Sequence, residues 1–163
     1  MSVRLTLVSL CALLLVGCAT GPGFSGDHIN LDLQPRGALA ADAAVRGQTV
    51  LWGGRIIQTV PEEGVTTVEV LAFPLRGNQQ PNTGMESQGR FLVVHPGYLE
   101  PADFSADRLI TVVGTLEASR SGQVGEAEYR YPVVRVDSLH LWPLQREQSE
   151  PRVHFGIGVG ISR

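Results

Sequence analysis

The chain has 163 residues, a formal net charge of −3 at pH 7 and two cysteines. A chain of this length fits a single domain that buries about 70% of the surface of its unfolded state. The acidic balance argues against a nucleic-acid-binding protein, because such proteins normally carry a basic patch and a high isoelectric point. We therefore expect no nucleic acid among the partners.

The first residues have the composition of an export signal. Arg4 supplies one positive charge, and residues 5–16 form an apolar run with the length of a signal-peptide hydrophobic region. This run is too short to cross a bilayer, which needs about 20 apolar residues. The sequence predicts a signal peptide over residues 1–17.

The last residues of this signal, Leu15, Val16 and Gly17, are followed by Cys18, and the four together resemble the lipobox of bacterial lipoproteins. The resemblance implies that the signal peptidase recognises the first three residues. It also implies that the thiol of Cys18 receives a diacylglycerol and that its freed amino group is acylated. Three acyl chains hold a protein on a membrane, since two already suffice. The alternative is an ordinary secretory leader followed by a coincidental cysteine.

The anchor sets the expected partners, which are the membrane and the lipoprotein processing and sorting machinery. Ala19, rather than an aspartate, follows Cys18, which resembles the outer-membrane sorting pattern of Gram-negative lipoproteins. Cys11 lies in the leader and Cys18 carries the lipid, so we expect no disulfide, no cysteine metal site and no cysteine nucleophile. Apart from the covalent lipid, no cofactor is expected.

Residues 18–44 have the composition of a tether that begins at the lipidated Cys18. Glycine, proline and serine dominate its first half, and an alanine-rich piece follows. Chains rich in glycine are flexible, whereas residues 39–45 have the composition of one helical turn. We expect a spacer that lifts the following domain off the lipid surface.

From Gly47 onward apolar residues recur at every second position, which is typical of half-buried strands. The first strand runs from there to a hairpin turn at residues 61–64. The later strands are expected at residues 65–75, 90–95, 109–119 and 128–142, with a loop at 77–89, helical turns at 98–104 and a second hairpin turn at 120–125.

Prolines and glycines mark irregular points in these strands. Pro74 ends the second strand, because proline has no amide to donate. Pro132 predicts a bulge that moves the inward face from Tyr129 and Tyr131 to Val134 and Val136. The adjacent Gly53 and Gly54 predict a bulge or a close backbone contact in the first strand.

This order of elements predicts an all-β fold over residues 45–144. Five strands with one short helix between the third and the fourth indicate a small five- to six-stranded OB-like barrel. Closure would remove the edges that a flat sheet exposes to aggregation; an open sandwich is the alternative. Residues 145–163 predict a polar linker and a final strand, in which glycines alternate with Phe155, Ile157, Val159 and Ile161.

Several segments, taken in their order and spacing, resemble the Slp family of outer-membrane lipoproteins. They span residues 45–142 after the lipobox and include 47–56, 69–75, 89–92, 99–101, 109–114 and 131–142. The resemblance implies a protein anchored in the outer membrane and facing the periplasm, in a family associated with starvation and envelope stress. It implies no established catalytic residues.

Titratable residues offer little catalytic or metal chemistry. None of the four histidines, His28, His95, His140 and His154, is spaced from another as metal ligands are. The nearby carboxylates Glu100, Asp103 and Asp107 lack the glycine and terminal glutamate of a calcium loop. We expect the acids to cap a helix and to aid solubility, and we expect no metal site.

Four aromatic residues are the candidate ligand face, namely Trp52, Tyr129, Tyr131 and Trp142. An OB-like barrel can present such side chains to sugars or bases, so together they would suggest binding of an oligosaccharide or a peptidoglycan fragment. The alternative is that they pack in the core.

The preferred function is a non-catalytic envelope protein whose barrel contacts another envelope protein or peptidoglycan. Residues 155–161 would add a strand to the edge of a partner's sheet. A glycan-binding or small-ligand-binding module is the second hypothesis. A periplasmic hydrolase is the third, and it requires a buried histidine or carboxylate in a concave pocket.

Overall fold

The segments with period-two alternation form five strands, and these strands form a barrel. The computed structural model describes residues 21–144. The barrel strands are β2 (Thr49–Glu62), β3 (Val65–Ala72), β4 (Arg90–Pro96), β5 (Leu109–Val124) and β6 (Ala127–Leu141). A sixth, two-residue strand, β1 (Ile29–Asn30), pairs in parallel with the start of β2.

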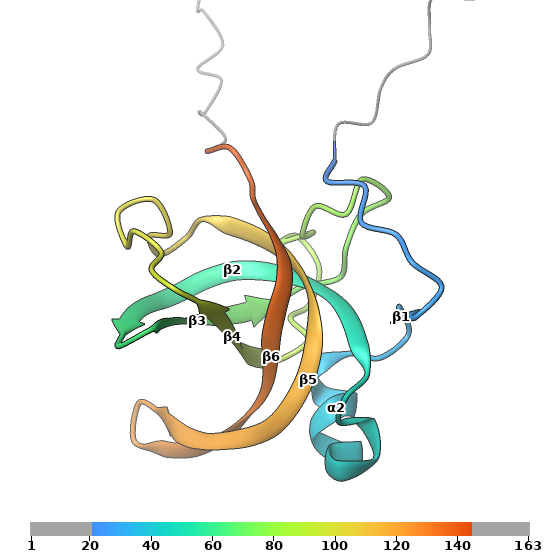
Figure 1. Ribbon diagram of the computed structural model, residues 1–163, viewed down its shortest axis with the longest axis horizontal. Helices are drawn as coiled ribbons and strands as arrows, with labels where there is room; N and C mark the ends of the chain where they lie inside the picture. Colours follow the sequence, from blue (N-terminus) through green and yellow to red (C-terminus); the bar gives the residue numbers. More distant parts are fainter. Residues whose placement is uncertain (1–20, 145–163) are drawn as a thin grey trace, which may run out of the picture.

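The sheet closes into a barrel because β2, at one end of the strand order, also pairs with β5 at the other end. Hydrogen-bonded neighbours follow the order β2, β3, β4, β6, β5, and β5 pairs back with β2. The β4–β6 pair is parallel, whereas the other barrel pairs are antiparallel. Figure 1 shows β5 and β6 wrapping around the other strands. The predicted all-β barrel is confirmed, and the open sandwich is excluded.

Alternating burial places one face of each strand in a common core. In β3, buried and half-buried residues alternate over the whole strand. β-branched and aromatic side chains fit such a pleated, half-buried surface. The core cluster contains Ala38, Val50, Trp52, Ile56, Val68, Val70, Ala72, Phe91, Val93, Ile110, Val112, Leu116, Val134 and Val136.

The predicted close contact at Gly53 and Gly54 is present where β2 passes between two neighbours. Gly54 pairs with Ala72 of β3 and also with Ile110 of β5. A Cβ atom on Gly54 would run into the backbone carbonyl of Leu71. Glycine is therefore needed here to let two neighbouring backbones approach the strand.

In the β5–β6 hairpin, the position of the turn differs from the prediction, whereas the bulge is where it was predicted. The predicted turn at residues 120–125 is wrong: β5 continues to Val124, and the turn is Gly125-Glu126. The ladder from Arg120–Tyr131 to Val124–Ala127 supplies backbone partners that local turn propensity ignores. The bulge at Pro132 is confirmed, because the register shift there sets two residues of β5 opposite this one proline.

The short helix lies before the barrel and not between its third and fourth strands. It is α2 (Pro35–Ala41), with Pro35 in its first turn, and a 3-10 turn η1 (Asp42–Val45) follows. Residues 98–104 form only turns, in which the amides of Asp103 and Phe104 both donate to the carbonyl of Glu100 at 3.0 Å. Within residues 21–144, no helix is long and apolar enough to cross a membrane.

The predicted flexible tether over residues 18–44 is also corrected from Gly21 onward, since this part is folded onto the barrel. Ala38 of α2 is 4% exposed and belongs to the core cluster, against which Leu33 and Val45 also pack. Asn30 Nδ2 donates to Gln48 Oε1 at 2.9 Å. We call residues 21–45 the N-terminal segment. The predicted strand at residues 155–161 lies outside the described residues.

Replacing Gly54 by alanine should destabilise the barrel by about 1–3 kcal/mol, because the new methyl group has no space beside the Leu71 carbonyl. Urea unfolding followed by fluorescence of the two buried tryptophans measures the effect. Gly77→Ala is the matched control, since a Cβ at Gly77 meets no atom within 4 Å. The control should change stability by less than about 0.5 kcal/mol; equal effects would contradict the steric explanation.

Candidate functional site

Both tryptophans of the candidate aromatic face lie inside the protein. Trp52 is 4% exposed and Trp142 is 5% exposed. The Trp52 ring packs edge-on against Phe91 with centroids 5.3 Å apart, and its Nε1 donates to the carbonyl of Leu33 at 2.6 Å. The Trp142 Nε1 donates to Thr111 Oγ1 at 2.9 Å. Each indole is thus a packing group with a satisfied N–H.

The two tyrosines belong to a separate polar cluster with Arg90 and Glu69. Their rings are 4.7 Å apart and edge-on. The hydroxyl of half-buried Tyr129 accepts the Arg90 amide at 3.0 Å, and the hydroxyl of buried Tyr131 lies 3.3 Å from Glu69 Oε1. Arg90 and Glu69 form an ion pair at 2.6 Å.

The expected shared ligand face of Trp52, Tyr129, Tyr131 and Trp142 is therefore not what the structure shows. Three of the four are buried, and the fourth uses its hydroxyl to accept a backbone amide. Period-two patterning indicates which residues share a face, but it does not say whether that face is inside. For both tryptophans and Tyr131, the core-packing alternative is correct.

Burial raises the pKa of the Tyr131 hydroxyl above its ordinary value, and the negative charge of Glu69 raises it further, whereas the charge of Arg90 lowers it. The neutral phenol is therefore favoured in the folded state. A tyrosine with a raised pKa is not activated as a nucleophile or a base near neutral pH. The cluster has the chemistry of a structural hydrogen-bond network.

The raised pKa gives a pH-dependent stability. The contribution of Tyr131 is fully present below the unfolded tyrosine pKa of about 10, and it is lost as the pH rises through the higher folded pKa. As the pH rises above about 10, the Tyr131→Phe variant should therefore lose less stability than the unsubstituted chain. Thermal unfolding across this range tests the effect. Absorbance at 295 nm should show a smaller late-titrating phenol signal in the variant, and identical pH profiles of stability for both proteins would contradict the prediction.

The structure does not bring the histidines or the acidic residues together as a site. His28 is exposed before β1, His95 lies on β4 and His140 on β6; His154 lies outside the described residues. Within residues 21–144, no group of three His, Cys, Asp or Glu residues could hold a metal ion.

Two of the three carboxylates near residues 100–107 have local contacts. Glu100 Oε1 accepts the amide of Ala102 at 3.3 Å, which caps a turn in place of the expected helix. Asp107 lies 3.7 Å from Arg55 in an exposed ion pair.

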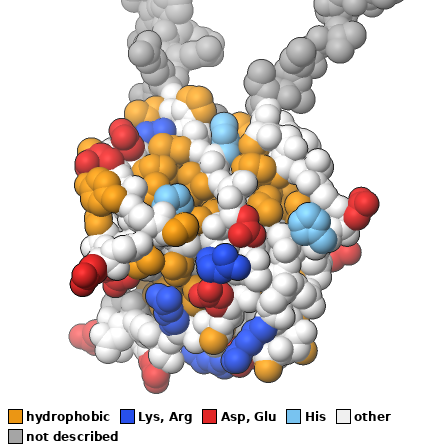
Figure 2. Space-filling model, viewed as in Figure 1, with side chains coloured by type: hydrophobic (Ala, Val, Ile, Leu, Met, Phe, Trp, Pro, Cys, Tyr) orange, Lys and Arg blue, Asp and Glu red, His pale blue; other side chains and the backbone are white. Residues whose placement is uncertain are grey.

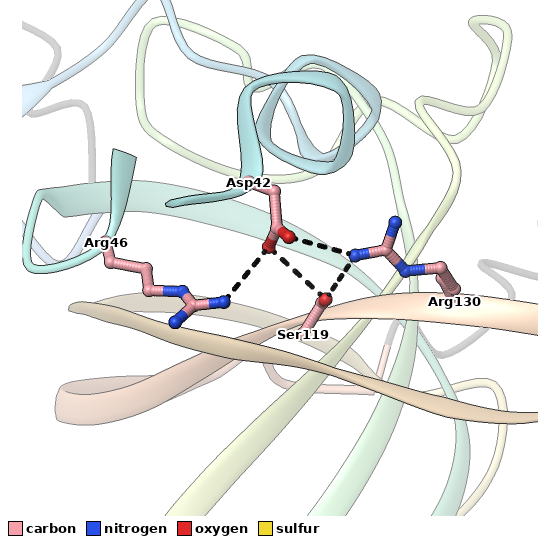
Figure 3. Close-up of polar contacts among 4 residues, drawn as sticks. All are labelled: Asp42, Arg46, Ser119 and Arg130. Carbon is pink, nitrogen blue, oxygen red and sulfur yellow. Dashed lines mark hydrogen bonds and ion pairs between the residues drawn. The ribbon is translucent and has the colours of Figure 1, made fainter. Parts of the chain in front are cut away.

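A polar cluster around Asp42 joins the N-terminal segment to the last hairpin (Figure 3). Asp42 Oδ2 pairs with Arg130 at 3.1 Å and Oδ1 with Arg46 at 3.7 Å. Arg130 donates to Ser119 Oγ at 2.7 Å, and this hydroxyl is 3.3 Å from Asp42 Oδ1. The Ser119 hydroxyl is shared between a carboxylate and a guanidinium, and these contacts hold η1 on β5 and β6.

The candidate binding site is a groove of about 520 Å³ between the N-terminal segment and the barrel. We call it the N-terminal groove. Its residues come from three parts of the chain: the segment before α2, the start of β2 and the loop after β3. They are Phe24, Ser25, Gly26, Asp27, Ile29, Leu31, Leu33, Gln34, Leu51, Trp52, Phe73, Pro74, Leu75, Arg76, Gln79 and Gln88.

Hydrogen bonds between distant residues fix the walls of the N-terminal groove. The amide of Phe24 donates to Gln79 Oε1 at 2.9 Å, and Gln79 Nε2 donates back to the Phe24 carbonyl at 2.6 Å. The amide of Phe73 donates to the Gly53 carbonyl at 3.0 Å. Of the aromatic residues expected at a ligand site, Trp52 alone lines this groove.

The groove combines apolar walls with few charges. Leu31 is 70% exposed on one wall, and the charged lining residues are Asp27 and Arg76. Small-molecule sites of about 300–1,000 Å³ have this mixture of apolar walls and a few polar groups. No histidine lines the groove, so its chemistry suits binding more than proton transfer.

These features define the chain as a small closed β-barrel domain that follows a lipobox-like sequence. The model of the family described as "Outer membrane lipoprotein Slp family" matches residues 15–157. The chain therefore belongs to the outer membrane lipoprotein Slp family, as its resemblance predicted. The match begins at Leu15, so it includes Cys18.

Curated relatives agree with this assignment. An uncharacterized protein of Haemophilus influenzae is 32% identical over 84% of this chain and 75% of its own length. The uncharacterized lipoprotein YeaY of Escherichia coli is 29% identical over 89% of this chain and 75% of its own length. Outer membrane protein Slp of the same organism is 25% identical over 61% of this chain and 52% of its own length.

One solved structure, Schizosaccharomyces pombe Pot1pC bound to single-stranded DNA, matches 77% of this chain and 91% of its own. Its TM-score of 0.30 and identity of 11% are too low to support a functional comparison.

Proposed function

We propose that this protein is a lipid-anchored, non-catalytic protein on the periplasmic face of the outer membrane, where its barrel binds another component of the envelope. The observation that carries the proposal is the family match from Leu15 onward, which includes the lipobox-like sequence. On this proposal the signal peptide of residues 1–17 is removed, and Cys18 carries a diacylglycerol and an N-acyl chain such as palmitate. A role in starvation or envelope stress is the biological setting that the family suggests.

The chemistry of the groove supports binding as opposed to hydrolysis. A hydrolase needs a nucleophile within hydrogen-bond reach of a base. The groove lining offers one hydroxyl, Ser25, and the acid Asp27, without a histidine. Elsewhere in residues 21–144, Ser119 shares its hydroxyl with Asp42 and a guanidinium.

Cys18→Ser should abolish lipid attachment and release the protein from the membrane fraction. The serine has no thiol to accept the diacylglycerol, and without acyl chains nothing remains to give stable anchoring. Mass spectrometry of the purified protein and fractionation of cells measure both effects. Cys11→Ser is the matched control, because this cysteine lies in the removed leader. We expect the Cys11→Ser control to carry the lipid and the Cys18→Ser variant to lack it. An unmodified Cys18 in the native protein would contradict the proposed lipid anchor.

The proposed membrane and face are tested in the same cells. Density-gradient separation should place the lipidated protein with outer-membrane markers. Protease added to intact cells should leave the protein whole, whereas protease added after permeabilisation of the outer membrane should degrade it. Degradation in intact cells would contradict the periplasmic orientation.

A second candidate function is the binding of a small amphipathic ligand, including a peptidoglycan fragment, in the N-terminal groove. The volume of about 520 Å³ and its mixed lining favour it. The ligand would place its apolar part against Leu31 and Leu33 and its polar part near Asp27 and Arg76.

Leu31→Arg should weaken the binding of an apolar anionic dye, anilinonaphthalene sulfonate, at least about fivefold, because a bulky charged side chain would occupy the apolar wall of the groove. Dye fluorescence measures the dissociation constant, and muropeptides are titrated as competitors. Met85→Arg is the control, since Met85 is 55% exposed outside the groove lining. Equal weakening by both variants would contradict a site at the groove, and a lack of competition by millimolar muropeptides would exclude them as its ligands.

A further inference from the structure

Both ends of the described chain lie at one end of the barrel. In Figure 1 they are at the top, whereas α2 and the tip of the β5–β6 hairpin are at the bottom. Residues from the two ends line one surface hollow of about 500 Å³. Its lining defines what we call the exit surface: Gly21, Asn78, Gln80, His140, Trp142, Pro143 and Leu144.

The N-terminal segment is held to the barrel as far as its first described residue. The backbone of Gly21 packs so closely on the carbonyl of Asn78 that a Cβ atom would overlap it. Three residues later, Phe24 and Gln79 exchange two hydrogen bonds. Gly21, the first described residue, therefore lies against the barrel on the exit surface.

The distance from this point to the proposed lipid is limited by covalent geometry. Cys18 precedes Gly21 by three residues, which span at most about 10–11 Å when fully extended. The interfacial region of each leaflet is roughly 5–8 Å thick, from the difference between the hydrocarbon core and the whole bilayer. A lipid whose chains lie in the hydrocarbon core thus holds Gly21 at or just above the headgroups.

We infer that the exit surface rests on the phospholipid headgroups of the membrane that holds the Cys18 lipid, and that the β5–β6 hairpin points away from it. This orientation rests on the proposed lipid anchor. The predicted spacer would lift the domain off the lipid surface, whereas in this orientation the domain contacts the bilayer.

The chemistry of the exit surface suits a lipid interface. Its lining contains no Asp, Glu, Lys or Arg. Leu144 is 69% exposed there, and the half-buried His140 lines the same hollow.

The opposite end of the barrel is charged. Asp42 of η1 and Arg130 of β6 form their ion pair there, and Glu126 is exposed at the hairpin tip. On the face shown in Figure 2, apolar side chains gather toward the ends of the described chain, while most arginine side chains lie in the other half. Arg55, Asp107 and Arg108 line a separate hollow that also reaches Pro143 and Leu144, so charged side chains border the uncharged lining of the exit surface.

The test uses lipidated full-length protein with one reactive cysteine, since the thiol of Cys18 is blocked by its lipid. Leu144→Cys and Glu126→Cys are matched exposed positions at the two ends. Each is labelled with an environment-sensitive fluorophore and reconstituted into vesicles of phosphatidylethanolamine and phosphatidylglycerol, with and without lipids that carry a quencher near the headgroup. Thermal unfolding of both labelled variants checks that they are folded.

We expect quenching at residue 144 to exceed quenching at residue 126 at least about threefold, because headgroup quenchers act only over short distances. Mass spectrometry and vesicle flotation establish the anchor in the same samples. Flotation of lipidated protein with equal quenching at both positions would overturn the orientation alone. An unmodified Cys18 with no flotation would overturn the proposed anchor and the orientation with it.

Discussion

The hydrogen bond from the buried Trp52 indole to the Leu33 carbonyl ties the barrel to the N-terminal segment. A buried N–H without an acceptor costs about 1–3 kcal/mol, and this acceptor lies outside the barrel strands, at 2.6 Å. Ala38 completes the same core from α2. The barrel and the N-terminal segment are therefore one packing unit. For this reason, the position of the N-terminal segment on the barrel is defined by the fold itself.

The same docking creates the N-terminal groove. One wall belongs to the segment before α2, and the other belongs to β2 and the loop after β3. The Phe24–Gln79 hydrogen bonds close one side of this arrangement. A site built in this way depends on contacts between residues that are far apart in the sequence, and so the groove and the exit surface share a cause. The proposed ligand site and the proposed membrane contact consequently both include residues of the N-terminal segment.

Local patterns predicted the barrel, but they could not predict these long-range contacts. Period-two alternation located the strands, and the special backbone properties of Gly54 and Pro132 located a close contact and a bulge. Residues 21–26 have the composition of a linker, and so they were predicted to be flexible. They are held to the barrel by a contact between Phe24 and Gln79, which are 55 residues apart, and local composition does not predict such a contact. The extended β5–β6 hairpin was missed for a related reason: Gly122 favours a turn locally, yet its pairing with Tyr129 prevails.

Barrel closure also limits how the described part of this protein can recognise a partner. A closed sheet leaves few free backbone groups, and short edge strands resist pairing with other chains. Here β1, the extra strand, has two residues. Recognition by residues 21–144 must then depend mainly on side chains, and the N-terminal groove supplies them in a concave arrangement. A partner that pairs its backbone with this protein would need a strand from another part of the chain, which is the role that the alternating residues 155–161 were predicted to have.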